Sequence, residues 1–249
     1  MATREEMSRS FGGAADVYET GRPQYPAEAV EWMLQPVRGA DGLVRVADVG
    51  AGTGKLTRAL VDAGAQVVAA DPDAAMLAAL RGGLPGVTTY VGTGESLPLP
   101  DAAFDAVVFG QAWHWVDPVA ASAEVGRVLR HGGVLGLVWN IRDTDVPWVV
   151  ELGEIMHGSN AEIMMAEGGP EVSAPFDGLE SRSWRWARPM TREQLFDMAH
   201  SRSYVITAEP TERERIDREL GALFDRIGAV GDAPVDLPYV TTAFRALRP

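Results

Sequence analysis

The stretch Val44-Arg45-Val46-Ala47-Asp48-Val49-Gly50-Ala51-Gly52-Thr53-Gly54 decides the fold of this chain. An apolar strand pattern ends in Asp-x-Gly-x-Gly-x-Gly and runs directly into a helical pattern over residues 55–62. A second apolar strand, residues 66–70, follows and is closed by an acid, Asp71. Glycines at the carboxyl end of a strand admit a ligand that a Cβ would hold away, and an acid at the tip of the next strand is where such folds bind ribose hydroxyls. The stretch predicts a nucleoside-binding site.

The spacing of the glycines separates the kinds of nucleoside site. A dinucleotide site has Gly-x-Gly-x-x-Gly, which after Gly50 and Gly52 requires glycine where this chain has Lys55. A phosphate-binding loop has Ser or Thr after Gly-Lys, but here Leu56 follows. Both phosphate interpretations therefore fail at a defined residue. A glycine turn that serves packing alone is the remaining alternative, and the spaced acid favours a ligand site over it.

Composition excludes several classes of function. The 249 residues suit one α/β domain with a small cap. No apolar run of about 18 residues predicts a membrane span, and residues 1–9 carry no apolar signal core. The absence of cysteine predicts no disulfide and no cysteine-ligated metal, and fits a cytoplasmic protein. A net charge of −13 opposes binding to nucleic-acid phosphates. The four scattered histidines lack ligand spacing, so we expect no metal site.

Apolar runs and helical periods alternate through the first 140 residues, which predicts a parallel sheet with helices on both faces. Continuously apolar strands indicate burial on both faces. Besides the strand that ends in the glycine motif, the predicted strands are 66–70, 87–92, 104–110 and 134–140, and the predicted helices are 55–62, 73–81 and 119–129. His131-Gly132-Gly133 matches the glycine signal that ends a helix.

After residue 140 the pattern changes. Helices are predicted over 146–157, with Pro147 in the first turn, over 191–200 and over 211–227. Thr191 and Gln194 occupy capping-box positions. Strands are predicted over 181–187 and 239–247. Residues 159–178 contain Gly, Pro and Met, and we expect a mobile insert or lid there.

The Asp-x-Gly-x-Gly-x-Gly loop resembles motif I of the class I S-adenosylmethionine (SAM) dependent methyltransferases. Residues 94–100, 104–108 and 124–133 resemble the motifs around the third, fourth and fifth strands of the small-molecule enzymes of that family. The opening Phe11, Tyr18 and Gly21-Arg22-Pro23-Gln24-Tyr25-Pro26, with Ala112-Trp113-His114-Trp115 after strand four, is similar to the methyltransferase type 11 branch that includes trans-aconitate methyltransferase-like proteins.

The resemblance implies an α/β fold: a Rossmann-like, seven-stranded, mostly parallel sheet with helices on both faces and a small helical cap or lid. Strands six and seven would form an antiparallel hairpin. A single domain would span residues 1–249. Residues 1–35 would cover the cofactor, residues 36–140 would form the SAM-binding core, and residues 141–249 would supply the cap and the last two strands.

The resemblance also implies that SAM is the cofactor and indicates which residues bind it. These are Tyr18, Arg22, Asp48, Gly50, Ala51, Gly52, Asp71, Pro72, Met76, Thr93, Gly94, Glu95, Gln111 and Trp113. Gly54 belongs to the same loop, and Arg22 would hold the cofactor carboxylate. One position departs from the pattern, because many relatives have Asp at Thr93, where it contacts the adenine amino group. A threonine hydroxyl accepts the same hydrogen bond.

His114 is the candidate catalytic residue. It follows strand four at the carboxyl edge of the sheet, where open α/β sheets bind ligands, and its ordinary pKa suits proton removal near neutral pH. The alternative is that the Trp-His-Trp segment only packs around the cofactor. Asn140 and Arg142 end strand five at the same edge. Either one orients a substrate, with Arg142 suited to bind an anionic one, or both belong to a solvated loop.

The predicted function is methyl transfer from SAM to a small-molecule carboxylate, hydroxyl or amine, releasing S-adenosylhomocysteine. In-line displacement at a sulfonium needs alignment and exclusion of water more than covalent help. A carboxylate is ionised at neutral pH and needs no base, whereas a phenol or amine makes His114 more important. The alternatives are other SAM chemistry that leaves methylthioadenosine, and SAM binding without catalysis. The sequence predicts no oligomeric state.

Overall fold

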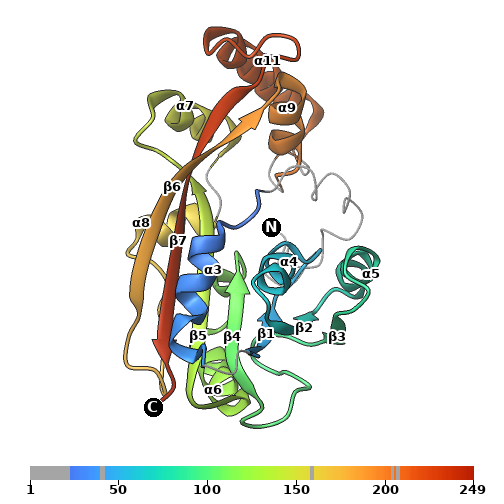
Figure 1. The fold of residues 1–249 in the computed structure, drawn as a ribbon. Coiled ribbons are helices and arrows are strands. Elements are labelled where there is room, and N and C mark those ends of the chain that lie inside the picture. The colour runs from blue at the N-terminus through green and yellow to red at the C-terminus, as the bar shows by residue number, and fades with distance from the viewer. Residues whose placement is uncertain (1–22, 40–42, 158–159, 203–204, 206–207) are drawn as a thin grey trace.

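A computed structural model describes residues 23–39, 43–157, 160–202, 205 and 208–249. One sheet of seven strands forms its centre (Figure 1). Its spatial order is β3-β2-β1-β4-β5-β7-β6. The strands are β1 Arg45–Val49, β2 Gln66–Asp71, β3 Thr88–Val91, β4 Phe104–Gly110, β5 Leu129–Arg142, β6 Glu180–Met190 and β7 Val235–Leu247.

The first five strands are mutually parallel, and β7 pairs antiparallel with both β5 and β6. From β1 the chain adds strands outward to β3, and then returns to place β4 on the other side of β1. This reversal leaves a crevice at the carboxyl ends of β1 and β4, where open α/β sheets bind ligands. The predicted Rossmann-like sheet is therefore confirmed.

Helices cover both faces of this sheet (Figure 1). Along the chain they are α3 Ala27–Leu34, η2 Gln35–Val37, α4 Lys55–Asp62, α5 Ala74–Gly83, η3 Trp113–Trp115, α6 Pro118–Val128, α7 Pro147–Met156, α8 Asn160–Ala166, α9 Arg192–His200 and α11 Pro210–Arg226. Asp73 and Asp117 cap α5 and α6 by accepting hydrogen bonds from first-turn amides.

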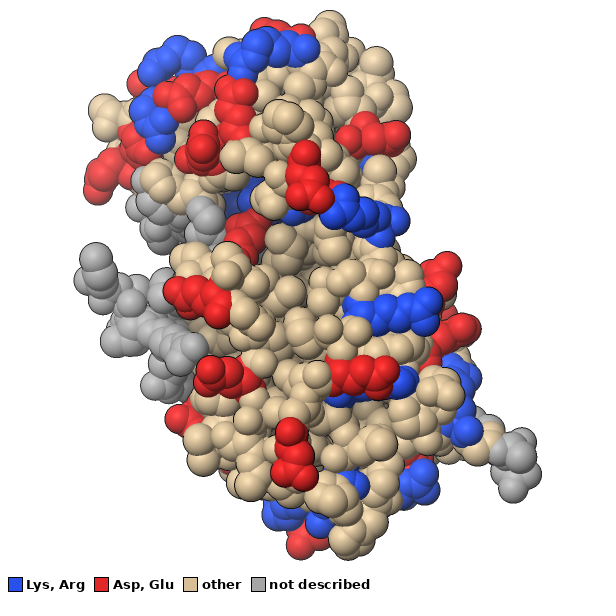
Figure 2. All heavy atoms as spheres, turned by 90° about the vertical axis from the view of Figure 1, so that its left-hand side faces the viewer, with Lys and Arg blue, Asp and Glu red and all other residues tan. Residues whose placement is uncertain are grey.

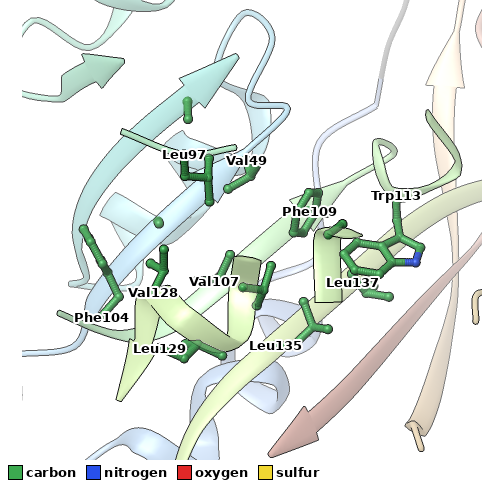
Figure 3. Close-up of a cluster of buried hydrophobic side chains, with 14 of the residues drawn as sticks. Val49, Leu97, Phe104, Val107, Phe109, Trp113, Val128, Leu129, Leu135 and Leu137 are labelled. Carbon is green, nitrogen blue, oxygen red and sulfur yellow. The ribbon is translucent and has the colours of Figure 1, made fainter. Parts of the chain in front are cut away.

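Alternate residues of the central strands face opposite hydrophobic clusters. Val46 and Val108 pack with α3 and α4, whereas Val107 packs with α6 on the other face. Figure 3 shows the second cluster, in which Leu135 and Leu137 of β5 meet Val107 and Phe109 of β4. Burial on both sides explains why these strands are continuously apolar.

A separate hydrophobic cluster forms the cap beyond the carboxyl end of the sheet (Figure 1). It joins α7, α9 and α11 to the extended ends of β6 and β7. The predicted capping box is confirmed, because the Thr191 hydroxyl accepts from the Gln194 amide and the Gln194 side chain accepts from the Thr191 amide. Pro147 lies in the first turn of α7 as predicted.

The interpretation of His131-Gly132-Gly133 as a helix stop was wrong. Helix α6 ends at Val128, and the three residues lie within β5, which begins at Leu129. The pairing of β4 with β5 shifts register here, and Gly132 has a φ of +71°. The Gly132 amide donates to the Arg248 carbonyl, and the Arg248 amide donates to the Gly133 carbonyl. The glycines therefore form a strand irregularity that joins β5 to the chain end.

Two further expectations change. The sequence predicts a mobile insert or lid over residues 159–178. Helix α8 lies there, and Ala161 and Phe176 are buried in the same hydrophobic cluster as Val107, so these two residues belong to the core; the lid role stays a prediction. The last two strands pair antiparallel as expected, but α9 and α11 separate them in the chain, so they are no simple hairpin.

Acidic and basic side chains are interspersed on the face shown in Figure 2, including over the cap in the upper part of the view. On α11, for example, Arg215 forms ion pairs with Glu212 and Glu219. Within the described ranges, no helix is long and apolar enough to cross a bilayer. The same residues contain no cluster of three or more His, Asp or Glu side chains arranged to hold a metal ion.

Candidate functional site

The glycine loop between β1 and α4 has left-handed backbone at all three glycines. The φ angles are +69° at Gly50, +55° at Gly52 and +94° at Gly54. A Cβ added at Gly50 would lie 2.5 Å from the Ala112 Cβ, so this glycine allows β1 and the turn after β4 to approach closely. A Cβ at Gly52 would meet no atom of the described residues within 4 Å. Gly52 therefore borders open space, whereas Gly50 and Gly54 are closely packed.

Asp71 at the end of β2 holds this loop in place. Its carboxylate accepts hydrogen bonds from the Gly52 amide and the Asp73 amide, each at 2.8 Å. Burial raises the pKa of Asp71, and the two amide hydrogen bonds oppose that rise. The acid predicted at the end of the second strand is therefore hydrogen-bonded to the predicted glycine loop.

Asp48 is a fully buried carboxylate beneath the same loop. Its Oδ2 accepts from the Thr57 hydroxyl at 2.6 Å, whereas its Oδ1 has no hydrogen-bond partner in the part of the chain that the structure describes. Burial raises the pKa of Asp48 to about 7; the Thr57 hydrogen bond opposes the rise and repulsion from Asp71 adds to it. A buried acceptor without a donor is costly, and a ligand or water that donates a hydrogen bond would satisfy it.

A pocket opens at the crevice between β1 and β4. Five predicted cofactor residues line it: Asp48, Gly50, Ala51, Gly52 and Gln111. Further lining residues are Pro23, Tyr25, Thr53, Lys55, Leu56, Gly110 and Asn140. Most of these continue the glycine loop or the end of β4, so adjacency to the motif was the signal that pointed to them.

The N-terminal segment contributes one wall of this pocket. Pro23 and Tyr25 line it, and a Cβ at Gly110 would lie 2.7 Å from the Tyr25 hydroxyl. Helix α3, which follows, packs instead on the sheet, with Val30 and Met33 fully buried. The predictions for Tyr18 and Arg22 lie outside the described residues.

The remaining cofactor candidates follow the ends of β2 and β3. Pro72 comes directly after Asp71, and Met76 is buried on α5. Thr93 forms an isolated bridge with Ser96. A Cβ at Gly94 would collide with Val116, 2.8 Å away, and the Glu95 carboxylate accepts from the Asp117 amide. These contacts fix the turn after β3 against the segment after η3, and the binding roles of all five residues stay predictions.

Trp113 is part of the core. Its indole is buried and packs edge-on against Phe109 at 4.8 Å, as Figure 3 shows. Its N–H donates to the Glu171 carbonyl, so η3 is tied to the segment after α8. Among the described residues, Trp113 is not one of those that line the pocket, and its predicted contact with the cofactor stays a prediction.

His114 lies beside Trp115 on η3 and receives a hydrogen bond from the core. The fully buried Trp139 indole N–H donates to Nδ1 of His114 at 3.4 Å. An indole nitrogen donates only, so Nδ1 must carry the lone pair. In the neutral ring the proton therefore resides on Nε2.

Arg142 at the end of β5 is buried and bound. Its guanidinium donates to the Glu162 carboxylate on α8 at 2.6 Å, with the Met156 sulfur at 3.9 Å from its other terminal nitrogen. Two residues were expected to orient a substrate. Asn140 lines the pocket, whereas Arg142 is paired with Glu162 on α8 and contacts Met156 on α7.

Comparison with known proteins agrees with this geometry. A family model described as a methyltransferase domain matches residues 47–137. An uncharacterized methyltransferase of Mycobacterium tuberculosis is 44% identical over 245 residues, which cover 98% of both chains. A malonyl-[acyl-carrier protein] O-methyltransferase of Methylococcus capsulatus is 37% identical over 133 residues, 51% of this chain and 48% of that one.

Solved structures share the fold. One described as a type II methyltransferase from Anaeromyxobacter dehalogenans superposes with a TM-score of 0.64 at 23% identity, covering 91% of this chain and 97% of that chain. A phosphoethanolamine N-methyltransferase of Haemonchus contortus in complex with SAM gives 0.53 at 17% identity, over 100% of this chain and 60% of that chain. The glycine loop, the acid after β2 and the full-length relatives agree: this chain belongs to the class I SAM-dependent methyltransferases.

Proposed function

We propose that this methyltransferase uses the pocket between β1 and β4 to hold the amino-acid end of SAM, and that it methylates a small-molecule carboxylate. The hydrogen bond from Trp139 to His114 supports this choice of acceptor, because it engages the ring nitrogen through which the histidine would take a proton. An O-methyltransferase among the partial relatives supports an oxygen acceptor. We further propose that the enzyme acts in the cytoplasm, in line with its lack of cysteine.

The residues present fit SAM. Its ammonium group would supply the donor that Oδ1 of Asp48 lacks within the described chain, and the open space at Gly52 would admit the chain that carries it. Asp71 already accepts two amide hydrogen bonds and keeps acceptor capacity for ribose hydroxyls. Bound SAM supplies an electrophilic methyl group on sulfonium. The protein then has to align the acceptor and exclude water.

Affinity for the cofactor should depend on pH through Asp48. With a pKa of about 7 in the free protein, this carboxyl is protonated at lower pH and must lose its proton to pair with an ammonium. We expect the dissociation constant of S-adenosylhomocysteine to rise by about tenfold for each pH unit below 7 and to level off above it. Isothermal titration calorimetry between pH 5.5 and 8.5 measures this.

Thr57→Val removes the hydroxyl that lowers the pKa of Asp48. The bend in the affinity profile should therefore move to higher pH, with affinity at pH 8.5 recovering toward the wild-type value. A bend that stays in place while affinity falls equally at every pH would show that Thr57 acts only through packing.

His114 suits the role of a hydrogen-bond donor to the acceptor. To accept a proton at Nε2 the ring would need its hydrogen on Nδ1, where it would face the Trp139 N–H. A carboxylate brings its own negative charge, so methylation forms the ester and neutral S-adenosylhomocysteine with no proton to remove. An Nε2–H donor then orients the carboxylate without competing for a proton.

Replacement of His114 by Gln tests donor against base. A glutamine amide donates a hydrogen bond but accepts no proton at neutral pH. We expect His114→Gln to turn over within about threefold of the wild-type rate, and His114→Ala to raise KM for the acceptor by about tenfold because one charge-assisted hydrogen bond is lost. If the Gln variant instead turned over about 100-fold more slowly than wild type, the size of a general-base effect, the donor role would be overturned.

The reaction itself is tested by mass spectrometry of the protein incubated with SAM and small carboxylic acids. S-adenosylhomocysteine together with a methylated acid supports the proposal. A methylated amine or phenol would show that the acceptor is not a carboxylate. Methylthioadenosine in place of S-adenosylhomocysteine would show that the reaction takes place at another carbon bound to the sulfonium instead of at the methyl group.

A further inference from the structure

A run of hydrogen bonds connects the cap to the wall of the pocket. The Trp186 indole on β6 donates to the Thr241 hydroxyl at 2.8 Å. The Thr241 hydroxyl donates to Oδ1 of Asn140 at 2.6 Å. The Asn140 side-chain amide donates to the Gln24 carbonyl at 3.1 Å. Three strands and the N-terminal segment are thereby linked in sequence.

Every bond in this run has a fixed direction. An indole N–H only donates, so the Thr241 oxygen accepts and its own hydrogen must go to Asn140. Asn140 then presents its NH₂ group to the Gln24 carbonyl. Thr241 and Asn140 are both buried, where a reversed or missing bond leaves an unsatisfied polar group. Loss of the Thr241 hydroxyl therefore removes one of the two bonds that hold the Asn140 amide and leaves its buried Oδ1 without that donor.

The two ends of the run lie in different parts of the molecule. Trp186 stacks on Tyr239 with ring centroids 5.1 Å apart and packs against the cap cluster. Gln24 stands between Pro23 and Tyr25, which both line the pocket. Asn140 lines the pocket too, and its backbone carbonyl accepts from the side chain of Gln111. Asn140 is thus the point where the wall, β5 and the turn after β4 meet.

We propose that Asn140 is a positioning residue that seats residues 23–25 against the SAM pocket, and that Thr241, itself bonded to Trp186 beside the cap, holds the Asn140 amide in place. Packing of the cap strands and closure of the cofactor pocket are coupled through this run. The coupling to SAM rests on the cofactor site proposed above, whereas the seating of residues 23–25 is a property of the protein alone.

Thr241→Val is the first test, because it removes the hydroxyl and keeps the size and shape of the side chain. The Asn140 amide then loses the donor to its Oδ1 and is held only by its bond to the Gln24 carbonyl. We expect affinity for S-adenosylhomocysteine to fall by about fivefold, the effect of one buried hydrogen bond, with faster amide hydrogen exchange in a peptide covering residues 23–34. Thr242→Val is the matched control: its hydroxyl pairs with Ser183 on the exposed face of the same two strands. We expect that variant to match wild type in both measurements.

Two more variants test the expected order of the losses in affinity. Asn140→Asp keeps the acceptor for Thr241 but places an oxygen against the Gln24 carbonyl, and its loss of affinity should exceed that of Thr241→Val. Trp186→Phe keeps an aromatic ring against Tyr239 and removes the N–H together with part of the indole. Because the Thr241 hydroxyl stays, its loss of affinity should be the smallest. The proposal would be overturned if Thr241→Val matched Thr242→Val both in affinity for S-adenosylhomocysteine and in amide hydrogen exchange over residues 23–34. Failure of the wild type to bind S-adenosylhomocysteine would instead overturn the proposed cofactor site, and the exchange comparison would still test the seating.

Discussion

Asp48→Asn should abolish useful affinity for SAM while making the free protein more stable at pH 8. The wild-type carboxylate is fully buried, and its Oδ1 has no partner among the described residues until a cation arrives. Removing one member of a buried charge pair costs about 3 kcal/mol, or roughly 100-fold in the dissociation constant. Calorimetric titration with S-adenosylhomocysteine at pH 8 measures the loss.

The gain in stability follows from the raised pKa of Asp48. Because the folded pKa of about 7 exceeds the ordinary 3.8, the contribution of this carboxyl to stability is fully present below pH 4 and is lost as the pH rises to 7. An asparagine does not ionise, so it avoids that loss. We expect the variant to be more stable than wild type by about 4 kcal/mol at pH 8, with the difference vanishing near pH 4. Urea unfolding at the two pH values gives both numbers.

Asp105→Asn is the control for neutralising a buried acid. Asp105 accepts from the Arg45 amide and pairs with Arg130, at the amino end of β1 far from the glycine loop. Its replacement should lower stability and leave affinity for S-adenosylhomocysteine unchanged. Equal loss of affinity in the two variants would mean that Asp48 acts through the fold instead of through the ligand.

Gly52→Ala should be the second large effect. The added methyl group meets no atom of the described chain within 4 Å, so it would project into the space that we assign to the cofactor. Overpacking of this kind costs about 1–3 kcal/mol, which corresponds to roughly 10–100-fold weaker binding. The left-handed backbone, with φ of +55°, adds a stability penalty of about 1 kcal/mol.

Gly132→Ala separates the two parts of that effect. Gly132 also has left-handed backbone, φ +71°, and a Cβ there also meets nothing within 4 Å in the described ranges, but it lies in the β5 irregularity at the other end of the sheet. Thermal unfolding should show similar destabilisation in both variants. Calorimetric titration should show weaker S-adenosylhomocysteine binding only in Gly52→Ala. If both bind like wild type, the space at Gly52 is outside the cofactor site.

Short-range pattern was enough to predict the parallel half of the sheet. Strands β1, β2 and β4 are short, largely apolar runs, the helices between the strands have their own period, and motif I spans only residues 48–54. Pattern failed at His131-Gly132-Gly133, because glycine after a helix resembles a helix cap whether the next residues turn or enter a strand. The outcome was decided by the hydrogen bonds of Gly132 and Gly133 with Arg248 at the chain end.

The sequence by itself determined the fold, the family and the glycine loop with its spaced acid, because local periodicity and spacing encode them. Only the tertiary structure decided the state of the side chains in the site. The pKa of Asp48 depends on burial and the tautomer of His114 on Trp139. The orientation of Asn140 depends on Thr241 and Gln24, 101 and 116 residues away. Desolvation and hydrogen-bond partners arise from segments that meet only when the chain folds, and no local pattern specifies them.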